Sequence, residues 1–169
     1  MSKAFTKEDD RPEAPVLVRL PSASLPPGAK NYLTPDGAAR LRKDLEHLVE
    51  VERPRIAALS EPDDSKRQIQ VIDQRIRDLQ TSLQTAVIAP LPAGLQEQVR
   101  FGSSVTVREK DGEESTYRIV GVDEIDLERD WISFLSPIGR ALMNARVGQF
   151  VRIKLPACEK ELEIVSIGA

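Results

Sequence analysis

The chain has 169 residues, a net charge of −3 and 40% hydrophobic residues, enough for one or two small domains with a buried core. The near balance of charge excludes a general attraction to nucleic acid or anionic lipid. A single cysteine excludes an internal disulfide, and a single histidine argues against a structural zinc site. We expect a cytoplasmic protein without a membrane partner, because no apolar run approaches the ~20 residues that span a bilayer and the N-terminus lacks the apolar core of a signal peptide.

Residues 1–30 are rich in proline and contain little that could be buried, so we expect a disordered N-terminal tail there. Within residues 31–88, apolar residues recur at helical spacing in two separate runs. The first helix is expected to begin with Thr34 as N-cap and Pro35 at its first position, and to bend at Pro54 without ending there. The second helix carries isoleucine and leucine at alternating spacings of three and four from Ile69 to Leu83, the pattern of a coiled-coil seam.

These two helices predict an antiparallel coiled-coil hairpin over residues 31–88 that stands off the rest of the protein. A helix pair packed flat on a sheet is the alternative, although it would need a wider apolar stripe. A proline-containing linker follows at residues 89–98. From residue 99 the period changes to two, which predicts a small antiparallel sheet with a hairpin turn around Asp111-Gly112 and one short helix capped by Ser136. The fold class is therefore α+β.

An acidic stretch between the two helices holds Glu61, Asp63 and Asp64. Carboxylates are hard oxygen ligands that suit Mg²⁺, so these side chains could complete a metal site in another protein. The alternative is that Asp63 or Asp64 only caps the second helix. The sequence offers no nucleophile beside a histidine and no glycine-rich phosphate loop, so we expect a protein that is not itself an enzyme and holds no cofactor or metal of its own.

Several stretches, in order, resemble the GreA/GreB family of bacterial transcript cleavage factors. They are YLTPDGAARLRKDLEHL, VERPRI, IDQRIRDLQTSLQTAVI, VRFGSSVTV, YRIVGVDEID, ISFLSPIGRALMNARVGQFVRIKLP and ELEIVSI. Together they cover roughly residues 31–169, and the opening MSKAFTKEDD is more similar to the GreB branch.

The resemblance implies an FKBP-like fold for residues 99–169 and a coiled coil that enters the secondary channel of RNA polymerase. It also implies that an acidic tip helps to hold a catalytic Mg²⁺ of the polymerase, so that the factor lends ligands while the polymerase performs the cleavage. The segment that would grip the polymerase matches Leu135, Ser136, Pro137 and Ile138. DNA and RNA would be met only through the transcription complex, and the protein would be a monomer.

The chain departs from the family pattern at the tip. The family's Gly-Asp-x-x-Glu-Asn-Ala-x-Tyr motif is absent, and only 17 residues separate Arg53-Pro54 from Ile72-Asp73, about a dozen fewer than the pattern requires. At ~1.5 Å per residue in each of two helices, this loss shortens the hairpin by roughly 10 Å. The expected function is therefore a Gre-type elongation regulator that binds RNA polymerase without the usual tip.

Three alternatives stay open. The chain could still stimulate cleavage by docking differently, with Asp63 and Asp64 touching Mg²⁺ in trans. The FKBP-like domain could act as a peptide-binding module or prolyl isomerase, although it is poor in aromatic residues. The coiled coil could serve as an adaptor that dimerises through the Ile69–Leu83 seam.

Overall fold

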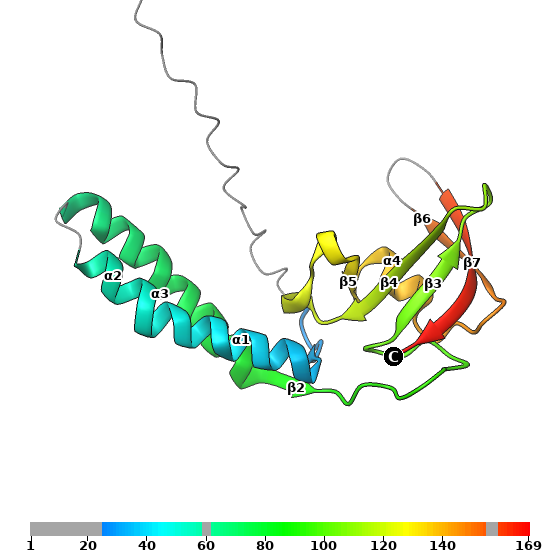
Figure 1. Cartoon of the computed structure of the whole chain (residues 1–169), viewed down its shortest axis with the longest axis horizontal. Coiled ribbons are helices and arrows are strands. Elements are labelled where there is room, and N and C mark those ends of the chain that lie inside the picture. The colour runs from blue at the N-terminus through cyan, green and yellow to red at the C-terminus, as the bar shows by residue number, and fades with distance from the viewer. Residues whose placement is uncertain (1–24, 59–61, 155–158) are drawn as a thin grey trace, which may run out of the picture.

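The computed structural model describes residues 25–58, 62–154 and 159–169. Figure 1 shows two helical segments lying side by side and projecting from a smaller body built around a sheet. We call the helical part (residues 35–57 and 62–85) the arm, and the sheet with its short helix the sheet body. Of the predicted disordered tail at residues 1–30, only residues 25–30 lie within the described chain, and they contain a turn in which Ala29 N donates to Pro26 O at 2.9 Å.

The first helical segment begins as the sequence predicted. Helix α1 spans Pro35–His47, and the Thr34 side chain caps it by accepting a hydrogen bond from Gly37 N at 3.0 Å. Pro35 occupies the first turn, where a missing N–H costs no hydrogen bond. The N-cap prediction is therefore confirmed.

Pro54 changes the geometry of this segment without ending it. A π-helical turn, η1 (Leu48–Glu52), lies between α1 and the short helix α2 (Arg53–Ala57). A proline ring in a regular α-helix would clash with the carbonyl of Glu50, four residues earlier. The wider π turn, in which Arg53 N donates to Leu48 O, relieves that crowding and lets the helix continue through Pro54.

The second helical segment, α3 (Pro62–Thr85), has 24 residues and packs against the first. Their shared apolar cluster consists of buried and partly buried residues from both segments and their ends: Leu33, Ala38, Leu41, Leu45, Leu48, Leu79, Leu83 and Ala86. Figure 1 shows α2 beside the start of α3 and α1 beside its end. The Leu79–Leu83 end of the predicted seam is therefore occupied within the chain itself.

Two short strands lie at the base of the arm, and the sequence did not predict them. Strand β1 (Asn31–Leu33) precedes α1 and pairs in parallel with β2 (Ala86–Ile88), which follows α3. Three-residue strands are too short to show a period of two. Their pairing depends on the packing of the helices, which brings residues more than 50 positions apart together.

The sheet body contains a curled five-stranded sheet in the order β5-β4-β3-β7-β6. Its elements are β3 (Ser104–Arg108), β4 (Glu114–Val120), β5 (Trp131–Ser133), α4 (Pro137–Leu142), β6 (Phe150–Lys154) and β7 (Glu159–Gly168). The predicted hairpin is confirmed: β3 and β4 pair antiparallel around a turn in which Gly112 has φ +89°. That φ is one that glycine adopts readily.

The prediction of a wholly antiparallel sheet is wrong at one edge. Strands β4 and β5 run parallel, with Arg118 opposite Trp131. The connection between them contains two 3-10 turns, η2 (Val122–Glu124) and η3 (Leu127–Arg129). These turns carry the chain back along β4 as far as Arg118 before β5 begins, so β5 runs beside the last three residues of β4 in the same direction. Residue patterns do not predict such a crossover, because strand direction is set by the path of the connection.

The core of the sheet body follows the predicted alternation along the strands. Its fully buried members include Val105 and Val107 on β3, Ile119 on β4, and Ile164 on β7. Val151 and Ile153 on β6 lie on the same side, as expected, whereas Leu155 lies outside the described residues. This core is separate from the apolar cluster of the arm, so each part has its own set of packed side chains.

Candidate functional site

Of the three acidic residues selected from the sequence, Asp63 and Asp64 belong to the start of α3, at the far end of the arm (Figure 1). Glu61 lies outside the described residues, and Asp63 is placed only as backbone in the first turn of α3. Asp64 is exposed in the same turn. Carboxylates near a helix N-terminus interact favourably with the helix dipole. Because α3 begins at Pro62, Asp63 and Asp64 are its second and third residues and do not occupy the N-cap position, and the exposed Asp64 is open to an external ligand.

Within the described part of the chain, no three carboxylate, histidine or cysteine side chains gather in a way that could hold a metal ion. The protein's described surface thus offers single ligands at the arm end, not a complete metal site. Among the same residues, no helix is both long enough and apolar enough to cross a membrane.

One ion pair joins the two helical segments of the arm between its base and its far end. Arg53 on α2 donates from Nε to Asp73 Oδ1 on α3 at 2.7 Å, and from a terminal guanidinium nitrogen to Oδ2 at 3.5 Å. The Arg53 hydrogen bond lowers the pKa of Asp73 below its usual value. This forked geometry fixes the register of α2 against α3. Both residues lie in the stretches that resemble the GreA/GreB family, but their contact is not evident from the sequence.

The segment Leu135–Ile138, here called the docking segment, connects β5 to α4. Ser136 is the N-cap of α4, as predicted, and its Oγ accepts from Gly139 N at 2.9 Å. Leu135 N donates to Ser133 Oγ at 3.1 Å. Pro137 is exposed, whereas Ile138 is partly buried and packs against the core of the sheet body. The structure therefore presents Pro137 and part of Leu135 outward on a well-anchored loop.

A close approach of backbone to backbone holds the docking segment in shape. A Cβ atom on Gly139 would lie 2.1 Å from Ser133 O, so only glycine fits at this position. Ser136 N also donates to Ser133 O at 3.0 Å. These contacts hold the loop rigid and keep its outer surface constant, which favours recognition by a partner.

An aromatic cluster connects the docking segment to the base of the arm. Phe134, directly before Leu135, packs its ring edge-on against Tyr32 and Phe101, with ring centroids 5.8 Å and 5.7 Å away. Tyr32 belongs to β1, next to α1. The sequence does not predict this cluster, because its members come from three distant positions in the chain.

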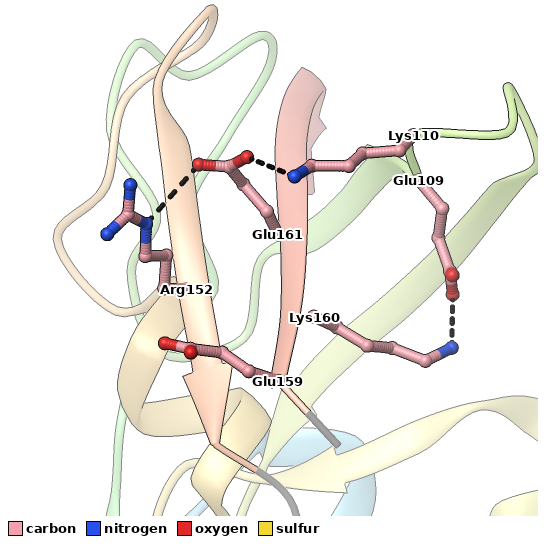
Figure 2. A pocket seen from close by; sticks show the side chains of 6 residues that line it. All are labelled: Glu109, Lys110, Arg152, Glu159, Lys160 and Glu161. Atoms are coloured by element: carbon pink, nitrogen blue, oxygen red, sulfur yellow. Dashed lines mark hydrogen bonds and ion pairs between the residues drawn. The ribbon is translucent and has the colours of Figure 1, made fainter.

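A surface hollow of about 360 Å³ lies at the other end of the sheet and is shown in Figure 2. Its lining residues are Glu109, Lys110, Arg152, Glu159, Lys160 and Glu161. Glu161 accepts from Lys110 at 3.1 Å and from Arg152 at 3.4 Å, and these bonds, that of Lys110 above all, lower its pKa. Lys160 pairs with Glu109 at 2.7 Å. Because these charges largely neutralise one another, the hollow does not select a ligand of either sign.

The two predicted functional surfaces lie apart on the molecule. Figure 1 shows the start of α3 at the outer end of the arm, and β5 and α4 within the sheet body. At ~1.5 Å per residue, the 24 residues of α3 extend about 36 Å. The arrangement thus suits a protein that is held at one place and acts at another.

Comparison with known proteins gives a consistent set of relatives. Residues 94–169 match the family described as "Transcription elongation factor, GreA/GreB, C-term". The transcription elongation factor GreB of Neisseria meningitidis serogroup B is 40% identical over 152 residues, which cover 82% of this chain and 93% of that protein. GreB of Pseudomonas aeruginosa is 38% identical over 149 residues, covering 80% of this chain and 88% of that protein.

The chain is also similar to a GreA relative and to a solved structure. The transcription elongation factor GreA of Rhodospirillum rubrum is 36% identical over 149 residues, covering 80% of this chain and 95% of that protein. The crystal structure of GreA factor homolog 1 (Gfh1) of Thermus thermophilus is 28% identical, with a TM-score of 0.40, and the match covers 83% of this chain and all of that one.

Proposed function

This chain belongs to the GreA/GreB family of transcription elongation factors, and from this premise we propose that it regulates elongation by binding RNA polymerase. The sheet body binds the rim of the polymerase secondary channel, and the arm enters the channel. The observation that carries the proposal is the relationship to GreB at 40% identity, which extends over arm and sheet body alike. The family match and the relatives give no support to a peptide-binding, prolyl isomerase or adaptor function.

The docking segment is the proposed polymerase contact. Its exposed Pro137 and partly exposed Leu135 are supported by the Ser136 cap and by the close Gly139–Ser133 approach. A small, rigid apolar surface of this kind loses little conformational entropy when it binds. The FKBP-like fold expected for residues 99–169 is part of the same proposal, since it would place this loop at one end of the sheet.

The arm is proposed to be an antiparallel hairpin that is too short to supply a metal ligand for cleavage. The alignment with the Neisseria GreB is 152 positions long, but it includes only 82% of the 169 residues of this chain, which is about 139 residues. About a dozen aligned positions of that GreB therefore have no counterpart in this chain. We assign the missing positions to the 17 residues between Arg53-Pro54 and Ile72-Asp73. A shortfall of roughly 10 Å is large against Mg–O distances of about 2.1 Å.

The chain would therefore act on the polymerase without being an enzyme and without a cofactor of its own. It would occupy the channel entrance and alter elongation, or compete with full-length factors for the same place. Any contact with DNA or RNA would come through the transcription complex.

A capture experiment with purified bacterial RNA polymerase tests the binding proposal. Immobilised protein should retain the polymerase, and Pro137→Asp should weaken the interaction at least tenfold. An acidic residue is tolerated in the first turn of α4, so this change adds charge to the surface while the fold is kept. Leu95→Asp is the matched control, because Leu95 is 91% exposed and lies outside the docking segment. Failure of the unchanged protein to retain polymerase would refute the proposal.

A transcript-cleavage assay on backtracked complexes tests the shortened arm. The protein should leave the cleavage rate at the level of polymerase alone, and Asp63→Ala with Asp64→Ala should change nothing. Cleavage that is stimulated by the unchanged protein and lost in the double variant would show that these carboxylates reach the metal, and would contradict the proposal.

A further inference from the structure

A completely buried carboxylate lies where the sheet body meets the arm. Glu124, in the 3-10 turn η2, is 0% exposed. It accepts hydrogen bonds at Oε2 from Thr34 N at 2.9 Å and from Gly121 N at 3.1 Å, and at Oε1 from the Thr34 hydroxyl. A buried carboxylate is costly unless it is hydrogen-bonded, and three donors satisfy this one.

This carboxylate is connected directly to the first helix of the arm. Thr34 is the N-cap of α1, and its hydroxyl both donates to Glu124 and accepts from Gly37 N. A Cβ on Gly37 would lie 1.8 Å from Glu124 Oε1, and a Cβ on Gly121 would lie 2.0 Å from Tyr32 O. The two glycines thus leave the space that the carboxylate and the strand need to approach each other.

The neighbouring residue makes a similar connection to the second helix. Asp123 Oδ2 accepts from the hydroxyl of Ser82, one turn before the end of α3, and from Asn31 Nδ2 at 3.4 Å. Asn31 Nδ2 also donates to Ser82 O at 3.1 Å. Adjacent carboxylates of η2 therefore hold the start of α1 and the end of α3.

We propose that Asp123 and Glu124 are positioning residues that fix the direction of the arm relative to the sheet body. Two contacts to different helices resist rotation that a single contact would permit. The arm extends about 36 Å. At that length a rotation of about 10° at its base would displace the far end by about 6 Å, more than the spacing of about 3.8 Å between consecutive Cα atoms. Any consequence of the arm's direction for elongation rests on the function proposed above, whereas the role of Asp123 and Glu124 in fixing that direction does not.

The sheet body does not need these contacts for its own core. Val122, the apolar residue of η2, does not belong to the apolar cluster built from the strands and α4. Removing the contacts should therefore loosen the arm while the sheet stays folded. A role in general stability, by contrast, would weaken both parts together.

Distance measurements between spin labels on the full-length chain test the proposal. Labels at Gln70→Cys on α3 and Ser166→Cys on β7 occupy exposed positions, in a background where the single native cysteine is replaced by Cys158→Ser. The unchanged junction should give a narrow distance distribution. Glu124→Gln combined with Asp123→Asn should at least double its width, while the amide spectrum of β3 and β7 is kept. Glu128→Gln, an exposed carboxylate in η3, is the matched control.

A milder pair of variants keeps the test decisive if the double variant does not fold. Thr34→Val removes the hydroxyl that donates to Glu124 and caps α1, and it should broaden the distribution, whereas Thr34→Ser retains both contacts and should keep the narrow form. An unchanged width in Thr34→Val, or in a folded double variant, would overturn the proposal. Because this readout needs no polymerase, its failure is distinct from a failure of polymerase capture.

Discussion

The forked bond between Arg53 and Asp73 is the best-defined polar contact along the arm. It joins α2 to α3 across residues 20 positions apart, with both side chains partly exposed. Its contribution depends on the charge of the carboxylate, since the Arg53 hydrogen bond lowers the pKa of Asp73 in the folded chain. A lowered pKa means that the folded state prefers the ionised form more strongly than the unfolded state does.

The lowered pKa of Asp73 determines how the stabilisation by this contact changes with pH. Its stabilisation should be complete above the ordinary aspartate pKa of about 4 and should be lost as the pH falls through the lowered value. Asp73→Asn should therefore reduce the unfolding midpoint at pH 7, and this reduction should become smaller as the pH falls below about 4. Thermal unfolding measured from pH 7 down to pH 2 checks this. Asp78→Asn, on the same helix, serves as control, and an Asp73→Asn difference that does not diminish over this range would contradict the assignment.

At the scale of elements, the arm depends on one narrow apolar contact between its two segments. Leu79 on α3 is 8% exposed and packs with Leu33, Ala38 and Leu41. Val71 on the same helix is 69% exposed. The π turn before Pro54 allows the first segment to pass a proline and still present Ile56 as a buried side chain. Packing, more than helix propensity, therefore holds the arm together.

Truncating the buried Leu79 and the exposed Val71 should change the free energy of unfolding by different amounts. Leu79→Ala should destabilise the protein by about 2–4 kcal/mol, because it removes buried methyl groups and leaves a cavity. Val71→Ala should change the stability by less than about 0.5 kcal/mol, as expected for an exposed site. Urea unfolding followed by circular dichroism at helical wavelengths checks both values. Equal effects of the two substitutions would show that α3 is not packed as described.

At the scale of the whole molecule, the arm projects from the sheet body and is joined to it at its base (Figure 1). This junction contains further contacts besides the η2 carboxylates. One is the Tyr32–Phe101–Phe134 cluster, and another is the Arg40 guanidinium, which lies 5.2 Å from the centroid of the Trp131 ring. The docking segment follows Phe134 directly. The part proposed to bind the polymerase is therefore packed against the part that determines where the arm points.

The protein should be a monomer in solution, because the Leu79–Leu83 end of its helical seam packs against α1 in the same chain. Sedimentation equilibrium should give the mass of one chain, and the sedimentation rate should be slower than that of a sphere of this mass because the arm is extended. The same mass should be found with Val71→Asp, which adds charge to the exposed side of α3. A dimer that Val71→Asp dissociates would show that this face pairs between chains.

Much of the local structure could be predicted from particular residues. Thr34 and Ser136, each followed by proline, gave the starts of α1 and α4, and the alternation at Val105 and Val107 gave a strand. A capped helix start such as that at Ser136 can be recognised from adjacent residues, whereas the contact of Leu135–Ile138 with the polymerase stays a prediction. Glu61 lies outside the described residues, and Asp63 and Asp64 stay predictions for which only the position at the start of α3 is known.

The sequence by itself determined the order of the long helices and of the strands of the sheet body, the capped starts of α1 and α4, and membership in the GreA/GreB family, because each of these depends on residues close together in the chain or on motifs in order. Only the tertiary structure decided the parallel pairings of β1 with β2 and β4 with β5, the aromatic cluster, and the burial of Glu124 against Thr34, 90 residues away. A carboxylate is buried only where another element supplies its donors. Local patterns cannot specify that meeting, which requires the packed arrangement of arm and sheet body.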